Sequence, residues 1–143
     1  MIYVDYLIYL NQMNNCVSSA NKIIEKAESY ESYSKTLQSV SENISTIAND
    51  LSSAYTNFVN GGYNSNGQGL YQNEILLCSG NATAISSLLH ELSNKTLRKI
   101  NDFKLEYNNI KNSYESAKHA FYSCKIHSGV VPVFPNFTVN VIL

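Results

Sequence analysis

Apolar residues recur along two long stretches of the chain at alternating steps of three and four residues. One series runs from residue 37 to residue 58 without Gly or Pro, and a similar series runs from residue 6 to residue 27. A mean spacing of 3.5 residues keeps a narrow apolar stripe on the side of a helix that faces a long partner helix. We therefore predict one helix over about residues 4 to 59, with a change of register near residues 30 to 34.

A third series runs from residue 85 to residue 121, with one extra residue near Thr96. Gly61 and Gly62 are expected to end the first helix, because glycine accepts the left-handed conformation that follows many helix C-termini. The turn-forming sequence GGYNSNGQG follows, and Asn81 is a plausible N-cap for the second helix. These signals predict a tip over residues 60 to 81 and a second helix over about residues 82 to 123.

The predicted fold class is all-α: a long antiparallel two-helix hairpin that resembles a coiled coil and has a Gly-rich tip. The hairpin would occupy residues 1 to 128, and residues 129 to 143 would form an extended tail limited by Pro132 and Pro135. An aspartate at Ile47 is expected to destabilise strongly, since Ile47 would lie at the centre of the hairpin seam. The predicted seam residues are Leu37, Val40, Ile44, Ile47, Leu51, Phe58, Ile85, Leu89, Leu92, Ile100, Phe103, Tyr107 and Ile110.

A tip this long would pair Phe58 with the region near Ala84 and would leave the first ~20 residues without an intramolecular partner. Apolar residues continue there, and an exposed apolar patch marks an interface. We expect this end of the first helix and the far end of the second helix to contact a partner. The alternative is that the tail folds back and covers them. The predicted partner-binding residues are Tyr6, Leu10, Met13, Val17, Tyr114, Ala117 and Phe121.

Composition and charge narrow the classes of function. The net charge is -1 and only 15% of residues are charged. Nucleic-acid binding is not expected, because phosphate neutralisation requires a basic face. The apolar stretch at the N-terminus is too short to span a bilayer. The eleven tyrosines suit either a core or an interface, since a buried tyrosine needs a hydrogen-bond partner.

No catalytic or metal-binding pattern stands out. His90, His119 and His127 do not share a helix face with a carboxylate at metal-ligand spacing, and the three cysteines form no Cys-x-x-Cys pair. GGYNSNGQG lacks the Lys-Ser/Thr ending of a phosphate-binding loop. We expect no enzymatic activity, no metal and no cofactor.

The segment LSSAYTNFVNGGYNSNG, residues 51 to 67, and the apolar series from residue 85 to 121 give the chain a family resemblance. It resembles the small WXG-type proteins of bacterial type VII secretion, and more closely the longer helical-hairpin proteins encoded beside LXG toxins. Tyr107 and Tyr114 are followed four residues later by Lys111 and Lys118, where the family's export signal has an acidic residue. The resemblance therefore implies a helper whose partner carries the export signal.

Two functions follow as hypotheses. In the first, the chain is a targeting chaperone in the bacterial cytoplasm that binds the N-terminal helical region of an LXG toxin, with or without being co-exported. The partners would be the toxin or a second small helical protein. In the second, the chain self-associates into a structural helical bundle, a homodimer for example, without a toxin partner.

Overall fold

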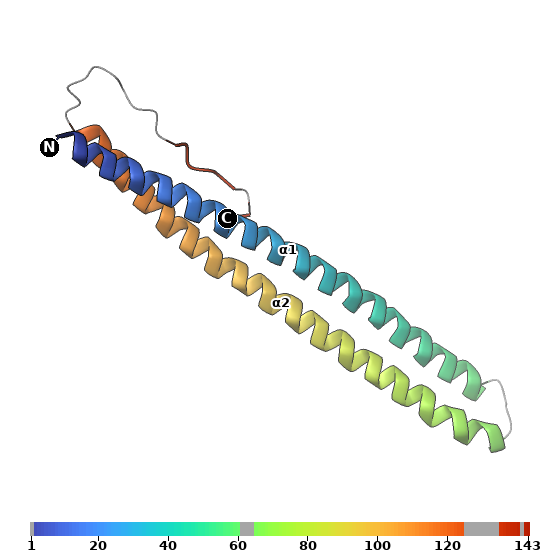
Figure 1. Ribbon diagram of the computed structural model, residues 1–143. Coiled ribbons are helices and arrows are strands. Elements are labelled where there is room, and N and C mark those ends of the chain that lie inside the picture. Colours follow the sequence, from blue (N-terminus) through green and yellow to red (C-terminus); the bar gives the residue numbers. More distant parts are fainter. Residues whose placement is uncertain (1, 61–64, 125–134, 141) are drawn as a thin grey trace. The chain divides into compact units, whose positions relative to one another are not determined.

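Two long helices that pack against each other make up the fold. The computed structural model describes residues 2–60, 65–124, 135–140 and 142–143. Helix α1 spans Ile2–Asn60 and helix α2 spans Ser65–Ser123, and they run antiparallel (Figure 1). The described residues outside them form neither helix nor strand. The predicted all-α fold of two packed helices is confirmed.

Helix α2 begins well before the predicted position. It starts at Ser65 and not near Ala82, so most of the sequence expected to form a tip is helical. Each glycine in a helix costs roughly 1 kcal/mol relative to alanine, but neighbouring side chains make contacts that offset this cost. Gln72 Nε2 donates to Tyr55 Oη at 2.8 Å, and Ser79 Oγ donates to the Ala48 carbonyl at 3.0 Å. The predicted tip glycines Gly61 and Gly62 lie outside the described residues.

The shorter connection changes which residues face each other. Tyr55 lies opposite Gln72, and Ser34 lies opposite Ser93. The two residue numbers of each pair have the same sum, as expected for an antiparallel pair of helices in constant register. The expected pairing of Phe58 with the region near Ala84 is therefore wrong, because it assumed a tip longer than the one that forms.

Contacts divide the chain into two compact units. The terminal unit comprises Met1–Glu31 and Arg98–Leu143, and the central unit comprises Ser32–Leu97. Each unit contains a segment of both helices.

The terminal unit has an apolar core between its helices. The pairing of Tyr6 with Phe121, whose ring centroids lie 6.0 Å apart in an edge-on arrangement, shows that the first turns of α1 do not overhang. Tyr30 packs edge-on against Phe103 with centroids 5.1 Å apart. Ile100, Phe103 and Tyr107, three of the predicted seam residues, are buried here. The buried apolar residues of this core are Met13, Ala20, Ile23, Ile24, Ala27, Ile100, Phe103, Tyr107, Tyr114, Ala117 and Phe121.

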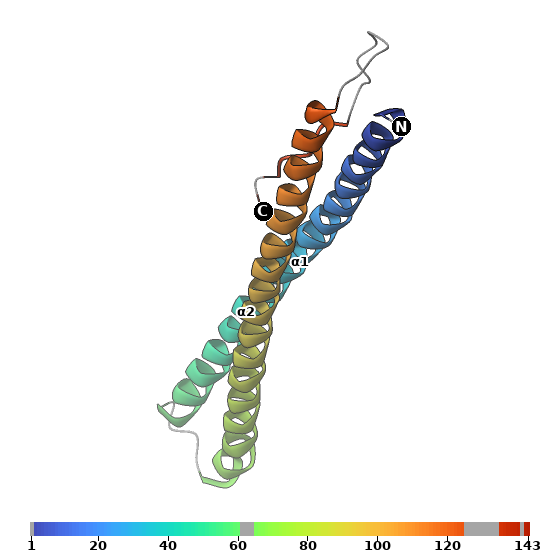
Figure 2. The ribbon, with the colours of Figure 1, turned by 90° about the vertical axis from the view of Figure 1, so that its left-hand side faces the viewer.

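Phe137 and the described residues beside it in the C-terminal tail lie against this core (Figure 2), which agrees with the alternative of a tail that folds back. The Phe137 ring lies 5.3 Å from the ring of Tyr107 and 5.2 Å from that of Tyr114. Tyr107 Oη donates to the Thr138 carbonyl, and Tyr114 Oη donates to the Pro135 carbonyl, both at 2.5 Å. The tail thus supplies the acceptors that these buried tyrosines require.

Tyr107→Phe is expected to lower the free energy of unfolding by about 1 kcal/mol, the usual net contribution of one hydrogen bond. The ring packing is preserved, so only the bond to the tail is lost. Thermal unfolding followed by circular dichroism measures the effect. An unchanged free energy of unfolding would contradict the role assigned to the tail contact.

Candidate interaction surface of the central unit

Serines, and not large apolar residues, fill the contact line between the helices of the central unit. Ser34 and Ser93 are buried with their hydroxyl oxygens 2.9 Å apart, and the Ser93 hydroxyl donates to the Ser34 carbonyl at 3.1 Å. Ser41 and Ser86 repeat this arrangement one heptad away: each hydroxyl donates to the other residue's carbonyl at 2.9 Å. We call the set Ser34, Ser41, Ala48, Ser79, Ser86 and Ser93 the serine seam.

Small side chains in this line have two physical consequences. They let two helix backbones approach closely, and their hydroxyls find acceptors on the facing helix. Among the described residues, no buried side-chain nitrogen or oxygen lacks a hydrogen-bond partner. A polar line of this kind can therefore be buried without the penalty that an unsatisfied hydroxyl carries.

The large apolar residues predicted for this part of the seam lie outside it. Val40, Ile47, Ile85 and Leu92 are exposed, so their assignment to the seam is wrong. The physical reason is their position: each precedes a serine-seam residue by one place, which turns it about 100° away from the contact line. The remaining predicted seam residues of these helices are half-buried, namely Leu37, Ile44, Leu51, Phe58, Leu89 and Ile110.

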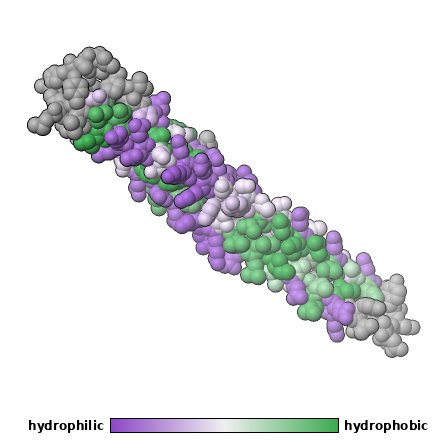
Figure 3. Space-filling view, in the orientation of Figure 1, coloured by the Kyte–Doolittle hydropathy of each residue, from purple (hydrophilic) through white to green (hydrophobic). Residues whose placement is uncertain are grey.

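The exposed residues Val40, Ile47, Ile85 and Leu92 lie on one face of the helix pair. An antiparallel pair has a two-fold axis perpendicular to the helices, which places equivalent heptad positions of the two helices on the same face. Ile47 precedes Ala48 just as Ile85 precedes Ser86, so the two positions are equivalent. Figure 3 shows hydrophobic surface gathered over this part of the molecule. We define the apolar face as Leu37, Val40, Ile44, Ile47, Leu51, Phe58, Ile75, Cys78, Ile85, Leu89 and Leu92.

A groove at one end of the apolar face supports this geometry. It has a volume of about 460 Å³ and is open to solvent. Leu51 and Phe58 of α1 form one wall, and Ile75 and Cys78 of α2 form the other, with Glu74 at the edge. Side chains from both helices therefore line one concave apolar surface of the kind that receives side chains of a partner.

Further exposed apolar residues of the central unit were not among the predicted seam or partner-binding residues. The region around Leu76 and Leu77 was expected to belong to a tip, although both residues lie on α2. Leu88 and Leu97 lie outside the apolar heptad positions. Heptad spacing of the serines was the available signal, because it fixes which positions face the other helix and hence which apolar residues do not. These exposed residues are Leu76, Leu77, Leu88 and Leu97.

The residues predicted to bind a partner are instead part of the terminal-unit core. Met13, Tyr114, Ala117 and Phe121 are buried together in one cluster. Half-buried side chains pack against that cluster, and they include Tyr6, Leu10 and Val17. The reason for placing a partner there was the expected overhang of α1, and the pairing of α1 with α2 removes that reason.

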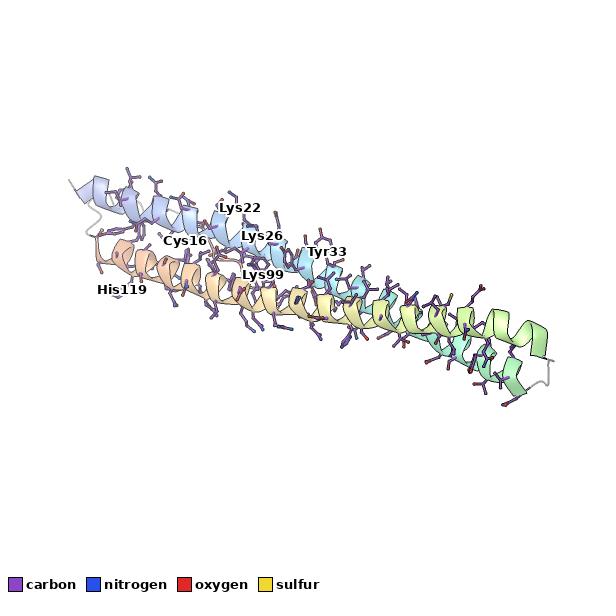
Figure 4. All side chains as sticks on the ribbon, turned by 90° about the horizontal axis from the view of Figure 1, so that it is seen from below. Cys16, Lys22, Lys26, Tyr33, Lys99 and His119 are labelled. Atoms are coloured by element: carbon purple, nitrogen blue, oxygen red, sulfur yellow. The ribbon has the colours of Figure 1, made fainter. Side chains whose placement is uncertain are left out.

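The titratable side chains form no reactive site among the described residues. Cys16 lies on α1 and His119 on α2 (Figure 4), and His119 and His90 are both exposed. Burial raises the pKa of the Cys16 thiol, which disfavours the nucleophilic thiolate. No group of three His, Cys, Asp or Glu residues within the described ranges is placed to hold a metal ion.

In the described part of the chain, neither helix contains a window that is apolar enough to cross a membrane. Comparison of the chain with protein-family models, with curated proteins and with solved structures gives no match.

Proposed function

We propose that the chain is a non-enzymatic partner protein that binds a helical region of another protein through the apolar face. The observation that carries the proposal is the exposure of Val40, Ile47, Ile85 and Leu92 on one side of a folded helix pair. A contiguous apolar patch in contact with water is a feature of protein interaction sites. Grooves between apolar side chains commonly receive the apolar side of an amphipathic helix.

The finer proposal is that the partner is an LXG toxin of bacterial type VII secretion. The chain would bind the N-terminal helical region of the toxin in the cytoplasm and present it for export. The hairpin architecture and the family resemblance of residues 51 to 67 support this assignment. The apolar face would then be covered in the complex.

Co-expression with an LXG-type toxin tests the proposal. We expect the two proteins to purify together, and we expect the double substitution Ile47→Asp and Leu92→Asp to weaken binding at least about 100-fold, as for central interface residues. Leu105→Asp is the matched control, because Leu105 is 65% exposed but lies in the terminal unit. Separate purification at micromolar concentration would overturn the toxin assignment. Equal weakening by the control would overturn the assignment of the face.

A second candidate is self-association through the same face. The two-fold relation between its α1 and α2 positions favours it, since a surface with this symmetry can pack against a second copy of itself. Sedimentation of the isolated protein separates the two candidates. A stable dimer that the substitutions at Ile47 and Leu92 convert to monomer would support self-association.

A further inference from the structure

Positive charge is missing from a long part of the chain that contains the whole apolar face. No Lys or Arg occurs between Lys35 and Lys95, while four acidic residues do: Glu42, Asp50, Glu74 and Glu91. The other Lys and Arg residues fall before or after this stretch. The part of the chain that carries the apolar face therefore has a net negative charge.

Glu74 brings this charge to the groove itself. Its side chain is exposed and lines the groove together with Leu51, Phe58, Ile75 and Cys78. Within the part of the chain that the structure describes, no lysine or arginine forms an ion pair with Glu74. A cation supplied from outside would thus find a carboxylate next to the apolar walls, and charge complementarity of this kind selects partners and speeds their association.

A second copy of the chain supplies this cation poorly. Its own corresponding segment carries cations only at its ends, Lys35 and Lys95, and Lys95 Nζ already lies 3.4 Å from Glu91 Oε1. Two copies in parallel alignment would bring acidic residues together, which disfavours association. The charge distribution therefore favours a different protein over a copy of this chain.

We propose that the apolar face binds an amphipathic helix of another protein that carries lysine or arginine beside its apolar anchor residues. Anchors of that helix enter the groove between Leu51, Phe58 and Ile75, and an adjacent cation pairs with Glu74. This inference rests on the proposed function in taking the apolar face as a binding site. It does not depend on the partner being a toxin.

Two synthetic helical peptides of about 20 residues, long enough to follow the face, test the inference on the full chain. Both carry leucines at the same helical spacing, and they differ in having lysines or glutamates beside the leucines. We expect the lysine peptide to bind about tenfold more tightly at low salt, and we expect the difference to shrink at high salt. Fluorescence anisotropy of labelled peptides measures both affinities.

Variants of the protein assign the preference to the groove. Glu74→Lys is expected to abolish or reverse the preference for the lysine peptide, whereas Glu115→Lys, a matched change of an exposed acid in the terminal unit, leaves it intact. Attachment of a bulky maleimide to the exposed Cys78 is expected to block binding of both peptides, and Cys78→Ser is the control that resists this block. Equal binding of the two peptides, or equal effects of Glu74→Lys and Glu115→Lys, would overturn the inference.

The outcomes separate this inference from the proposed function. Co-purification of the toxin by a chain that shows no peptide preference would leave the proposed function standing and would refute the basic helix. Selective binding of the lysine peptide by a chain that does not bind the toxin would support the basic helix and would refute the toxin as partner. If the protein is a stable dimer that binds neither peptide, the basic helix is refuted and a second copy of the chain occupies the apolar face.

Discussion

Ala48→Asp is expected to unfold the central unit, whereas Ile47→Asp is expected to leave it folded. Ala48 is 5% exposed between the helices, and Ile47 is 52% exposed on the apolar face. A carboxylate at Ala48 would be buried without a cation to pair with, which costs about 3–5 kcal/mol. A carboxylate at Ile47 remains in water, where substitutions usually change stability by about 0.5 kcal/mol.

The two substitutions form a matched pair because they introduce the same side chain at neighbouring positions of one helix. Differences in helix propensity and in net charge are therefore small, and burial accounts for the contrast. Urea unfolding monitored by circular dichroism gives both free energies. A larger loss of unfolding free energy for Ile47→Asp than for Ala48→Asp would mean that Ile47 lies between the helices, as hydrophobicity alone predicts. The assignment of Ile47 to the apolar face would then be wrong.

Hydrophobic periodicity was sufficient to predict the terminal unit's contact line on α2. Ile100, Phe103 and Tyr107 are both apolar and buried, so a search for apolar heptads finds the correct positions. In the central unit the same search selects Val40 and Ile47, because they are more hydrophobic than the serines beside them. The heptad of serines on each helix was visible in the sequence, but a rule based on hydrophobicity gives it no weight.

The hairpin register could not be obtained from the helices alone. Every cross-helix pair depends on the length of the connection, so the extension of α2 back to Ser65 shifts them all together. Glycines suggested a longer connection, since they favour turns, yet Gly80 is accommodated on an exposed side of α2 where an added Cβ would meet no atom within 4 Å. This error alone created the expected overhang at Tyr6 and the partner site placed there.

The tail illustrates a different limit of sequence reasoning. Its apolar residues and two prolines exclude a helix but fit several extended conformations. The eleven tyrosines likewise fit a core or an interface. The structure shows that these two features belong together, because the hydroxyls of Tyr107 and Tyr114 donate to the carbonyls of Thr138 and Pro135 in the tail. Each buried hydroxyl thereby specifies where one tail residue lies.

Ser93→Leu is expected to destabilise the central unit by several kcal/mol, although it replaces a polar residue with an apolar one in a buried position. The added atoms have no space between closely packed helices, and overpacking costs about 1–3 kcal/mol. The substitution also removes the 2.9 Å contact between the Ser93 and Ser34 hydroxyls. The Ser34 hydroxyl then keeps only the Ser93 carbonyl, 3.4 Å away, as an acceptor, and the loss of the shorter contact costs about a further 1 kcal/mol.

The double substitution Ser34→Ala and Ser93→Ala distinguishes the effects of size and polarity. It removes both hydroxyls and leaves small side chains, so we expect a change within about 1 kcal/mol, because replacing both partners of a hydrogen bond leaves no unsatisfied group. Chemical denaturation of both variants measures the free energies. If Ser93→Leu stabilises the chain, the helices are not held in close contact by the serine seam. The large apolar residues would then belong between the helices, where hydrophobicity alone would place them.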